Sequence, residues 1–451
     1  HRDLHKEYRR QRQMCIRDRD VEEVEEQQDA GPKFDADLLR MYYARLFPYE
    51  QMCKWLAYQP HGDASTPVGT GSTLAKRELS LTLADDVYIR YQCFGDAKAM
   101  KELMTKRQPH KIDIGAVFNA SPKDHLSIKN FRPEERELVF DIDLSDYDDV
   151  RTCCQGATVC RKCWQYMTCA CRVCESSLRE DFGFEHIMWV YSGRRGVHCW
   201  VGDAESRKLT NEARLAIIKY FSVVGGNENS AKKTDLQAPL HPSLERAYKL
   251  LEPLFIKHVI PEDGQKLLAS PEHWSKLLAT LPEDIAEQIA KHWARAGDAS
   301  TPAQKWDALK GLCASPDRGS SAKKQKRALV DELWKSEVVF THCYPRLDEN
   351  VSKHRNHLLK SPFAAHPKTG RVCVPFDAKQ CAAFDPTAVV TLKDLAKQID
   401  ASTEDVPDLE KTDLKHAVRF FEKSFIDPLL KSLHKGQRDE KEQQAAMVGD
   451  F

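Results

Sequence analysis

The feature that most constrains this chain is RELVFDIDLSDYDD at residues 136–149, where an apolar strand pattern runs directly into two carboxylates two residues apart. Because side chains alternate between the faces of a strand, Asp141 and Asp143 project from one face and Ile142 points into the core. Two carboxylates spaced about 6 to 7 Å along one strand face repel each other. A divalent cation such as Mg²⁺ relieves that repulsion. The alternative is a strand that ends in an acidic turn and caps the next helix.

A cysteine cluster follows directly, in TCCQGATVCRKC at residues 152–163. A Cys-x-x-Cys pair is a usual zinc-binding spacing, and an adjacent Cys pair can supply the other two thiolates of a closed tetrahedral site. Such a site has no open position for a substrate, so zinc would stiffen this loop. Two alternatives stay open: reduced core thiols, or competition from Cys169, Cys171 and Cys174. The predicted zinc ligands are Cys153, Cys154, Cys160 and Cys163.

The third motif is WVYSGRRGVHCWVG at residues 189–202, where two apolar runs flank a glycine- and arginine-rich turn. This pattern predicts a β-hairpin. Glycines allow the backbone to approach an anion, and arginines bind phosphate oxygens in a forked geometry. Ser192 and His198 can add hydrogen bonds. The alternative is a solvated basic loop.

In these motifs the chain resembles the small catalytic subunit of eukaryotic-type DNA primases, within the archaeo-eukaryotic primase superfamily. The resemblance extends from about residue 38 to the end of the chain and is faint at 204–335 and in the C-terminal tail. The segments that carry it are HKIDIGAV at 110–117, ELVFDIDLSDYDDVRTCC at 137–154, DFGFEHIMWVYSGRRGVHCWV at 181–201 and CYPRLDENVSKHRNHLLKSPFAAHPKTGR at 343–371.

The resemblance implies one site assembled from distant segments. It assigns Asp141, Asp143 and Asp348 to two Mg²⁺ or Mn²⁺ ions, with Asp348 returned to the same sheet by a distant strand. It implies a catalytic role for Glu78. The further polar lining would be Arg90, Lys111 and Asp113, and the alternative for these three and Glu78 is an exposed strand end. The implied nucleotide-binding residues are Ser192, Gly193, Arg194, Arg195, Gly196, Val197, His198, Asn356, His357, Leu358, Leu359, Lys360 and His366.

The implied fold is α/β with a mixed sheet, a zinc knuckle and an inserted all-helical subdomain. We expect a catalytic domain in two parts, at 34–205 and 336–451, the second with a helical tail. The helical insert would occupy 206–335, and residues 1–33 would be disordered or non-native. The local patterns predict an amphipathic helix at 38–58, strands at 77–83, 87–94, 111–118 and 136–143, a helix at 163–180 and a hairpin at 186–202.

The implied function is synthesis of short RNA primers from NTPs on single-stranded DNA by two-metal-ion nucleotidyl transfer. The implied partners are a large primase subunit and the DNA polymerase alpha complex, in the nucleus. Lys and Arg number 68 and so do Asp and Glu, so we expect weak template binding that depends on a partner. Two alternatives remain: a primase-polymerase that uses deoxynucleotides in repair, and a non-enzymatic zinc-stabilised scaffold.

The 15 cysteines, without an apolar signal segment, indicate a reducing compartment. No run approaches the roughly 20 apolar residues that a membrane-spanning helix needs. We therefore expect a protein that is not embedded in a membrane.

Overall fold

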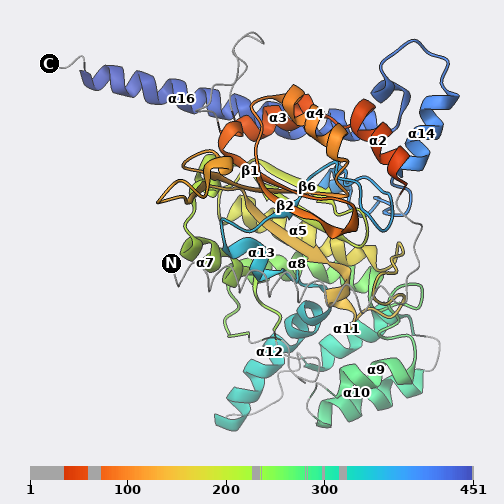
Figure 1. Cartoon of the computed structure of the whole chain (residues 1–451). Coiled ribbons are helices and arrows are strands. Elements are labelled where there is room, and N and C mark those ends of the chain that lie inside the picture. Colours follow the sequence, from red (N-terminus) through yellow and green to blue (C-terminus); the bar gives the residue numbers. More distant parts are fainter. Residues whose placement is uncertain are drawn as a thin grey trace.

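A computed structural model describes residues 35–448 except 59–72, 226–233, 235, 280, 282, 297–299 and 314–321. Two β-sheets lie between helical layers (Figure 1). The expected α/β class is confirmed, and every ladder between the strands described is antiparallel. No helix in the described part of the chain is long and apolar enough to cross a membrane. The extension at 1–33 lies outside the described residues.

The first sheet joins the N-terminal part of the chain to one short strand from far downstream. Its order is β2-β1-β3-β4, and β8 pairs with β3. Along β3, Ile112 and Ile114 are buried in the core, while Lys111 and Asp113 are half-buried on the other face. The strands are β1 (Arg77–Thr82), β2 (Tyr88–Gln92), β3 (Lys111–Phe118), β4 (Pro133–Glu135) and β8 (Leu359–Lys360).

The second sheet carries the acidic motif and the predicted hairpin. Its order is β5-β7-β6-β9. In the β5–β7 ladder Asp141 lies opposite His198, and Asp143 lies opposite Gly196. The strands are β5 (Leu138–Asp143), β6 (Ile187–Tyr191), β7 (Gly196–Val201) and β9 (Pro375–Phe376). The pairing of β6 with β7 confirms the predicted hairpin.

Helices lie on both sides of the sheets. In Figure 1, α3 and α4 lie above the sheets and α5 and α8 lie below them, with α9 to α12 farther below. The bounds are α4 (Ala97–Arg107), α5 (Trp164–Glu180), α6 (Ala204–Lys208), α7 (Asn211–Phe221), α8 (Pro242–His258), α9 (Pro271–Leu278), α10 (Glu283–Ala296), α11 (Pro302–Cys313), α12 (Ala322–Cys343), α13 (Glu349–Lys353), α14 (Leu392–Ala401), α15 (Leu414–Phe421) and α16 (Asp427–Val448).

The predicted continuous helix at 38–58 is wrong. The segment forms α2 (Ala36–Arg45) and α3 (Tyr49–Ala57), with a break at residues 46–48. Pro48 is the N-cap of α3, and a proline inside a helix lacks the N–H that the helical ladder needs. The predicted apolar face is nevertheless buried, at Leu39, Tyr42, Tyr43, Leu46, Phe47 and Trp55.

A fully buried ion pair joins the two sheets. Arg77 on β1 donates to the Glu137 carboxylate at 2.8 Å, directly before β5, and both side chains are 0% exposed. Arg77 also donates to the Gly115 carbonyl at 3.0 Å, and the Tyr58 hydroxyl donates to Glu137. Burial opposes ionisation, but the charge of Arg77 lowers the pKa of Glu137 to about 2. The pair therefore stays charged in the interior.

We expect Glu137→Ala to destabilise the fold by about 3–5 kcal/mol, because it leaves the Arg77 guanidinium buried without its counter-ion. Thermal unfolding should show a large loss of melting temperature. The control is Glu287→Ala, whose partner Lys291 is 67% exposed, and its cost should stay below about 1 kcal/mol. Equal melting temperatures for the two variants would contradict this assignment.

Candidate active site

Three aspartates from two distant segments meet at the end of β5. Asp141 and Asp143 share one face of β5, as predicted, and both are half-buried. Asp348 does not lie on a strand, so that part of the expectation is wrong. It is the N-cap of α13, and its carboxylate accepts from the Asn350 amide at 2.8 Å. Its own backbone N–H donates to the Asp141 carbonyl at 3.1 Å, which draws α13 to β5.

The carboxylates perturb one another. Burial, then the charges of Asp143 and Asp348, raise the pKa of Asp141 to about 7. The same causes in the same order raise the pKa of Asp146 to about 6. From the sequence pattern, the end of this segment is expected only to cap a helix. Asp146 is thus a fourth carboxylate in the negative electrostatic field of the site. Its position one turn beyond Asp143 is the sequence feature that could have identified it.

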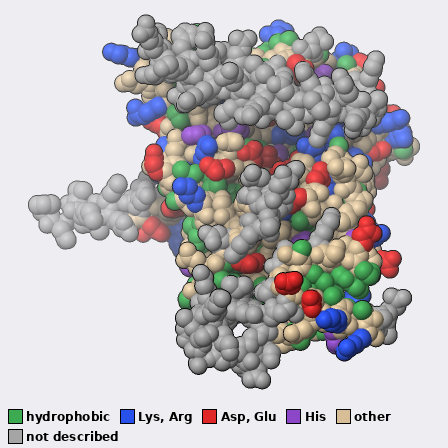
Figure 2. Space-filling model, turned by 90° about the horizontal axis from the view of Figure 1, so that it is seen from below, with side chains coloured by type: hydrophobic (Ala, Val, Ile, Leu, Met, Phe, Trp, Pro, Cys, Tyr) green, Lys and Arg blue, Asp and Glu red, His purple; other side chains and the backbone are tan. Residues whose placement is uncertain are grey.

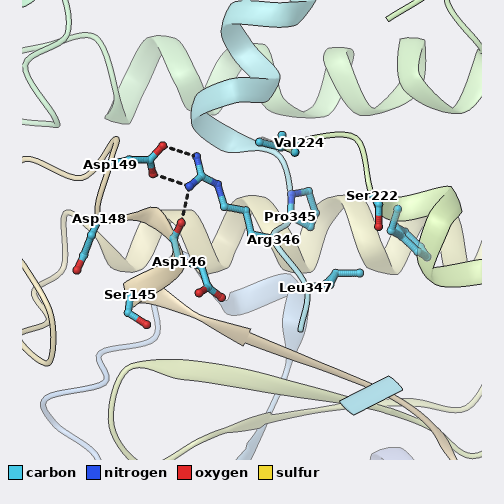
Figure 3. Close-up of a pocket in the computed structure, with 11 residues that line it drawn as sticks. Ser145, Asp146, Asp148, Asp149, Ser222, Val224, Pro345, Arg346 and Leu347 are labelled. Atoms are coloured by element: carbon cyan, nitrogen blue, oxygen red, sulfur yellow. Dashed lines mark hydrogen bonds and ion pairs between the residues drawn. The ribbon is translucent and has the colours of Figure 1, made fainter. Parts of the chain in front are cut away.

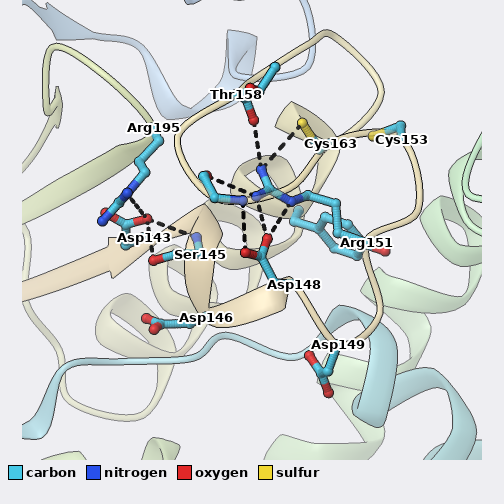
Figure 4. A network of polar contacts seen from close by, with 12 residues as sticks. Asp143, Ser145, Asp146, Asp148, Asp149, Arg151, Cys153, Thr158, Cys163 and Arg195 are labelled. Atoms are coloured by element: carbon cyan, nitrogen blue, oxygen red, sulfur yellow. Dashed lines mark hydrogen bonds and ion pairs between the residues drawn. The ribbon is translucent and has the colours of Figure 1, made fainter. Parts of the chain in front are cut away.

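Arg195 neutralises one of these carboxylates. Its Nε lies 2.7 Å from one Asp143 oxygen and 2.8 Å from the other (Figure 4). Asp143 also accepts from the Ser145 amide at 2.8 Å and the Ser145 hydroxyl at 2.9 Å. The expected phosphate-binding arginine therefore rests on the expected metal ligand, and cation binding at Asp143 would release it toward an anion.

The turn between β6 and β7 approaches its neighbours too closely for side chains at two glycines. Gly193 has φ +91°, and a Cβ there would lie 2.6 Å from the His366 Cβ. A Cβ at Gly196 would lie 2.3 Å from the Ile142 carbonyl oxygen. The sequence RRG is therefore part of a packed turn, and the alternative of a solvated basic loop is wrong.

The downstream segment holds this turn in place. The Lys360 amine donates to the Ser192 carbonyl at 3.4 Å, and the Thr369 hydroxyl donates to the Gly193 carbonyl at 2.8 Å. Burial, then the charge of Lys360, lower the pKa values of His198 to about 3 and of His366 well below the usual range. Both imidazoles are therefore neutral at physiological pH and act as hydrogen-bonding groups.

Not every residue of the expected nucleotide set presents a side chain to this site. Val197 and Leu359 are buried in the hydrophobic core, so only their backbone can contact a nucleotide. Leu358 lies over β3, where a Cβ at Gly115 would meet it at 2.7 Å. Burial and the neighbouring Arg136 lower the pKa of His357 to about 4.

The polar face of the first sheet completes the site. Glu78 is fully buried, so the alternative of an exposed strand end is wrong for it. Its carboxylate accepts from Arg90 at 2.9 Å and 3.1 Å. Asp113 accepts from the Ser80 hydroxyl at 3.2 Å and pairs across the ladder with Lys360. Because Lys360 lowers the pKa of Asp141, it links this face to the carboxylates of the second sheet.

A cavity of about 370 Å³ opens beside the carboxylates. Figure 3 shows Asp146 and Asp149 on one side and Pro345 and Leu347 on the other, with Arg346 reaching between them. Arg346 donates to Asp149 at 3.3 Å through one nitrogen. Leu347 directly precedes Asp348, so the cavity adjoins the metal-ligand candidates.

The four predicted zinc ligands converge. Their sulfur atoms all lie within 4.8 Å of one another, and no other group of three or more possible ligands in the described parts of the chain is so close. By contrast, Cys169, Cys171 and Cys174 are buried on α5 and do not belong to the cluster. The four converging cysteines are Cys153, Cys154, Cys160 and Cys163.

Hydrogen-bond donors surround this cluster. The Gln265 amide donates to the Cys153 sulfur at 3.3 Å, and an Arg151 nitrogen lies 3.9 Å from the Cys163 sulfur (Figure 4). Donors aimed at sulfur stabilise thiolates, which are the form that binds zinc. The donor set therefore fits a structural zinc ion. Gln265 lies far downstream of the loop, so no spacing rule could have found it.

Comparison with known proteins places the chain in one family. The family model described as DNA primase small subunit matches residues 140–378. The DNA primase small subunit of Drosophila melanogaster is 42% identical over 82% of this chain and 83% of its own length. That of Schizosaccharomyces pombe is 40% identical over 82% and 79%, and that of Saccharomyces cerevisiae is 32% identical over 87% and 92%.

We expect Asp141→Asn to raise the melting temperature at pH 8 in EDTA and to raise it much less at pH 5. The folded protein binds this proton more tightly than the unfolded chain, whose carboxyl titrates near about 4. Stability is therefore lost progressively as pH rises from the unfolded-state pKa to the folded-state pKa of about 7.

The measurement is differential scanning fluorimetry across pH, without metal and with added Mg²⁺. The cation should restore stability to the wild type at pH 8 and do so less in Asp141→Asn. A melting curve of the variant that tracks the wild type at every pH would contradict the raised pKa.

Proposed function

The chain belongs to the DNA primase small-subunit family, and from that premise we propose that this site synthesises RNA primers from NTPs on a single-stranded DNA template. A DNA primase is a DNA-directed RNA polymerase. The observation that carries the proposal is the meeting of three aspartates with a cationic turn across two polar sheet faces. In this proposal the nucleotide binds between Asp141 and Lys360, whose charge lowers the Asp141 pKa.

We assign the divalent ions to Asp141, Asp143 and Asp348. The raised pKa of Asp141 supports a fit, because burial and then the charges of Asp143 and Asp348 disfavour its negative charge, which a bound cation would stabilise. When bound, Mg²⁺ or Mn²⁺ lowers the free energy of the attacking and leaving oxygens. Carboxylate oxygens are the ligands that such hard cations prefer.

The protein's own groups position the triphosphate. Lys360 supplies a point charge. Arg195 supplies a forked guanidinium once Asp143 binds a cation in place of Arg195. His366 is neutral and donates or accepts a hydrogen bond. The attacking group is the 3′-hydroxyl of the growing primer, so no serine or cysteine nucleophile is needed. Catalysis rests on positioning and charge stabilisation.

The cysteine cluster would hold a structural zinc ion. Arg151 ties the loop to the acidic motif, since it donates to Asp148 at 2.9 Å and to the Thr158 and Gly156 carbonyls at 3.0 Å. The Gln265 side chain accepts a hydrogen bond from the Thr152 amide at 2.8 Å, which ties the loop to the helical insert. Zinc would thus stabilise the junction between the helical insert and the catalytic sheets.

Further proposals concern assembly. The relatives are named as small subunits, which implies a large-subunit partner. We propose that a large primase subunit binds this chain, and that both associate with the DNA polymerase alpha complex in the nucleus.

Asp348→Asn is the sharpest test of the metal assignment, because asparagine keeps the N-cap of α13 while removing the charge. We expect kcat for primer synthesis on poly(dT) with ATP to fall by about 10²-fold or more. The melting temperature should be unchanged or higher. A variant that keeps most of its activity would remove Asp348 from the site.

Arg195→Ala provides the contrast. It should chiefly raise the KM for ATP, by roughly 10-fold, since a charge-assisted hydrogen bond to the nucleotide is lost. Parallel reactions with dNTPs separate a primase from a primase-polymerase. RNA products on unprimed template support the proposal, and extension of supplied primers with dNTPs alone would replace it by the repair enzyme.

Cys160→Ser should release zinc and lower the melting temperature, because a thiolate ligand is lost from a closed site. Zinc content is measured by native mass spectrometry. The matched control is Cys174→Ser, which alters a buried thiol of α5 outside the cluster and should keep zinc. Full zinc content in Cys160→Ser would show that the ligand set is wrong.

A further inference from the structure

The polar face of the first sheet continues beyond the nucleotide site to an open strand edge. In the described residues β2 pairs with β1 alone, so its other edge carries no strand. Thr82 on β1 lies opposite Tyr88 on β2, and Arg90 reaches the Glu78 carboxylate of the active face. Tyr88 is 43% exposed. Polar side chains therefore extend along one side of the sheet from the active face to the solvent-exposed edge strand.

A bulge in β2 builds an aromatic stack at this edge. The ladder shifts register between Leu79 and Leu81, and Tyr91 adopts a left-handed φ of +60°. A non-glycine residue in this region is strained, and such strain is concentrated at functional sites. The Tyr91 ring stacks on His125 with centroids 3.8 Å apart, and the Arg90 guanidinium lies 4.9 Å over the same ring.

Exposed apolar side chains gather at the same place. Five large hydrophobic side chains are exposed in the described chain, and four of them lie on β2, directly before it, or in the adjoining loop at 121–132. They are Val87, Tyr88, Leu126 and Ile128. Phe131 of the loop stacks on Phe118 of β3 with ring centroids 4.2 Å apart, which fixes the position of the loop.

The loop adds positive charge to this apolar surface. Residues 121–132 carry exposed Lys123, Lys129 and Arg132 against Asp124, and Arg132 also lies 3.7 Å from the Glu134 carboxylate of β4. Figure 2 shows Lys and Arg side chains interspersed with Asp and Glu over the face that it presents, without one large basic field. On that face the described residues offer no extended basic surface to a nucleic acid. The cavity beside the active site is lined by three carboxylates and does not suit a polyanion.

We propose that β2 and residues 121–132, here called the edge platform, bind the single-stranded DNA template beside the active site. The inference rests on the proposed function and deepens it. Single-strand binding sites combine basic groups that follow the phosphates with aromatic or apolar side chains that contact base faces. The edge platform has both, and it is continuous with the face that carries Glu78 and Asp113. A template base paired with the incoming nucleotide must lie within reach of that face.

The test compares two charge reversals of equal size in the full-length chain. Lys123→Glu/Lys129→Glu changes the edge platform, and Lys291→Glu/Arg295→Glu changes exposed residues of α10 in the helical block. Fluorescence anisotropy with labelled dT20, over a salt series from low ionic strength, measures Kd. We expect the platform variant to weaken binding about 10-fold or more and to flatten the salt slope by about 1.4, because single strands give about 0.7 per phosphate contact.

A second variant tests the base contact. Tyr88→Ala should weaken dT20 binding about 5-fold or more without changing the salt slope, because stacking is not a counterion effect. In primer synthesis both platform variants should raise the KM for template and leave the KM for ATP unchanged.

Three outcomes would overturn the inference. The first is a Kd for dT20 in the platform variants that equals the wild-type Kd. The second is an equal loss of dT20 affinity in the α10 control. The third is retained dT20 binding with lost co-elution of the purified large subunit, which would make the surface a protein interface. The proposed function can fail separately. A wild-type chain that binds dT20 through the edge platform but makes no primer would support the binding surface and contradict the proposed enzymatic activity.

Discussion

The structure depends on holding three carboxylates together against their mutual repulsion. The backbone N–H of Asp348 donates to the carbonyl of Asp141, so a main-chain bond, which charge does not weaken, fixes the distance between the two segments. Arg136 supports the same junction from below. It is fully buried at the start of the acidic motif and donates to the Val351 carbonyl of α13 at 3.2 Å. These backbone and buried side-chain contacts thus hold the carboxylates together against their electrostatic repulsion.

The buried ion pair between Arg77 and Glu137 has a related role. It ties β1 of the first sheet to the residue before β5 of the second, so the two polar faces stay opposed. A charged pair in the interior offers little net stability by itself, but it fixes a register that an apolar contact would leave free to slide. The site between the sheets inherits its geometry from this pairing.

The basic groups of the site act on the same aspartates that are proposed to bind the cation. Arg195 balances Asp143, and Lys360 lowers the pKa of Asp141, while His198 and His366 remain neutral. A bound cation would take over the aspartates and free the basic groups for an anion. Metal and nucleotide binding are therefore expected to support each other through shared residues.

The sequence by itself determined the local elements that carry chemistry. The alternation of β5 places Asp141 and Asp143 on one face, the hairpin at 186–202 follows from two apolar runs around glycines, and the cysteine spacing indicates the thiolate cluster. These features depend on neighbours in the chain. The tertiary structure alone decided that α13 carries Asp348, that Gln265 faces Cys153 and that Arg195 rests on Asp143. It also decided where the edge platform lies. Such contacts join residues far apart in the chain, and their energies arise only when packing brings the segments together, so no local pattern encodes them.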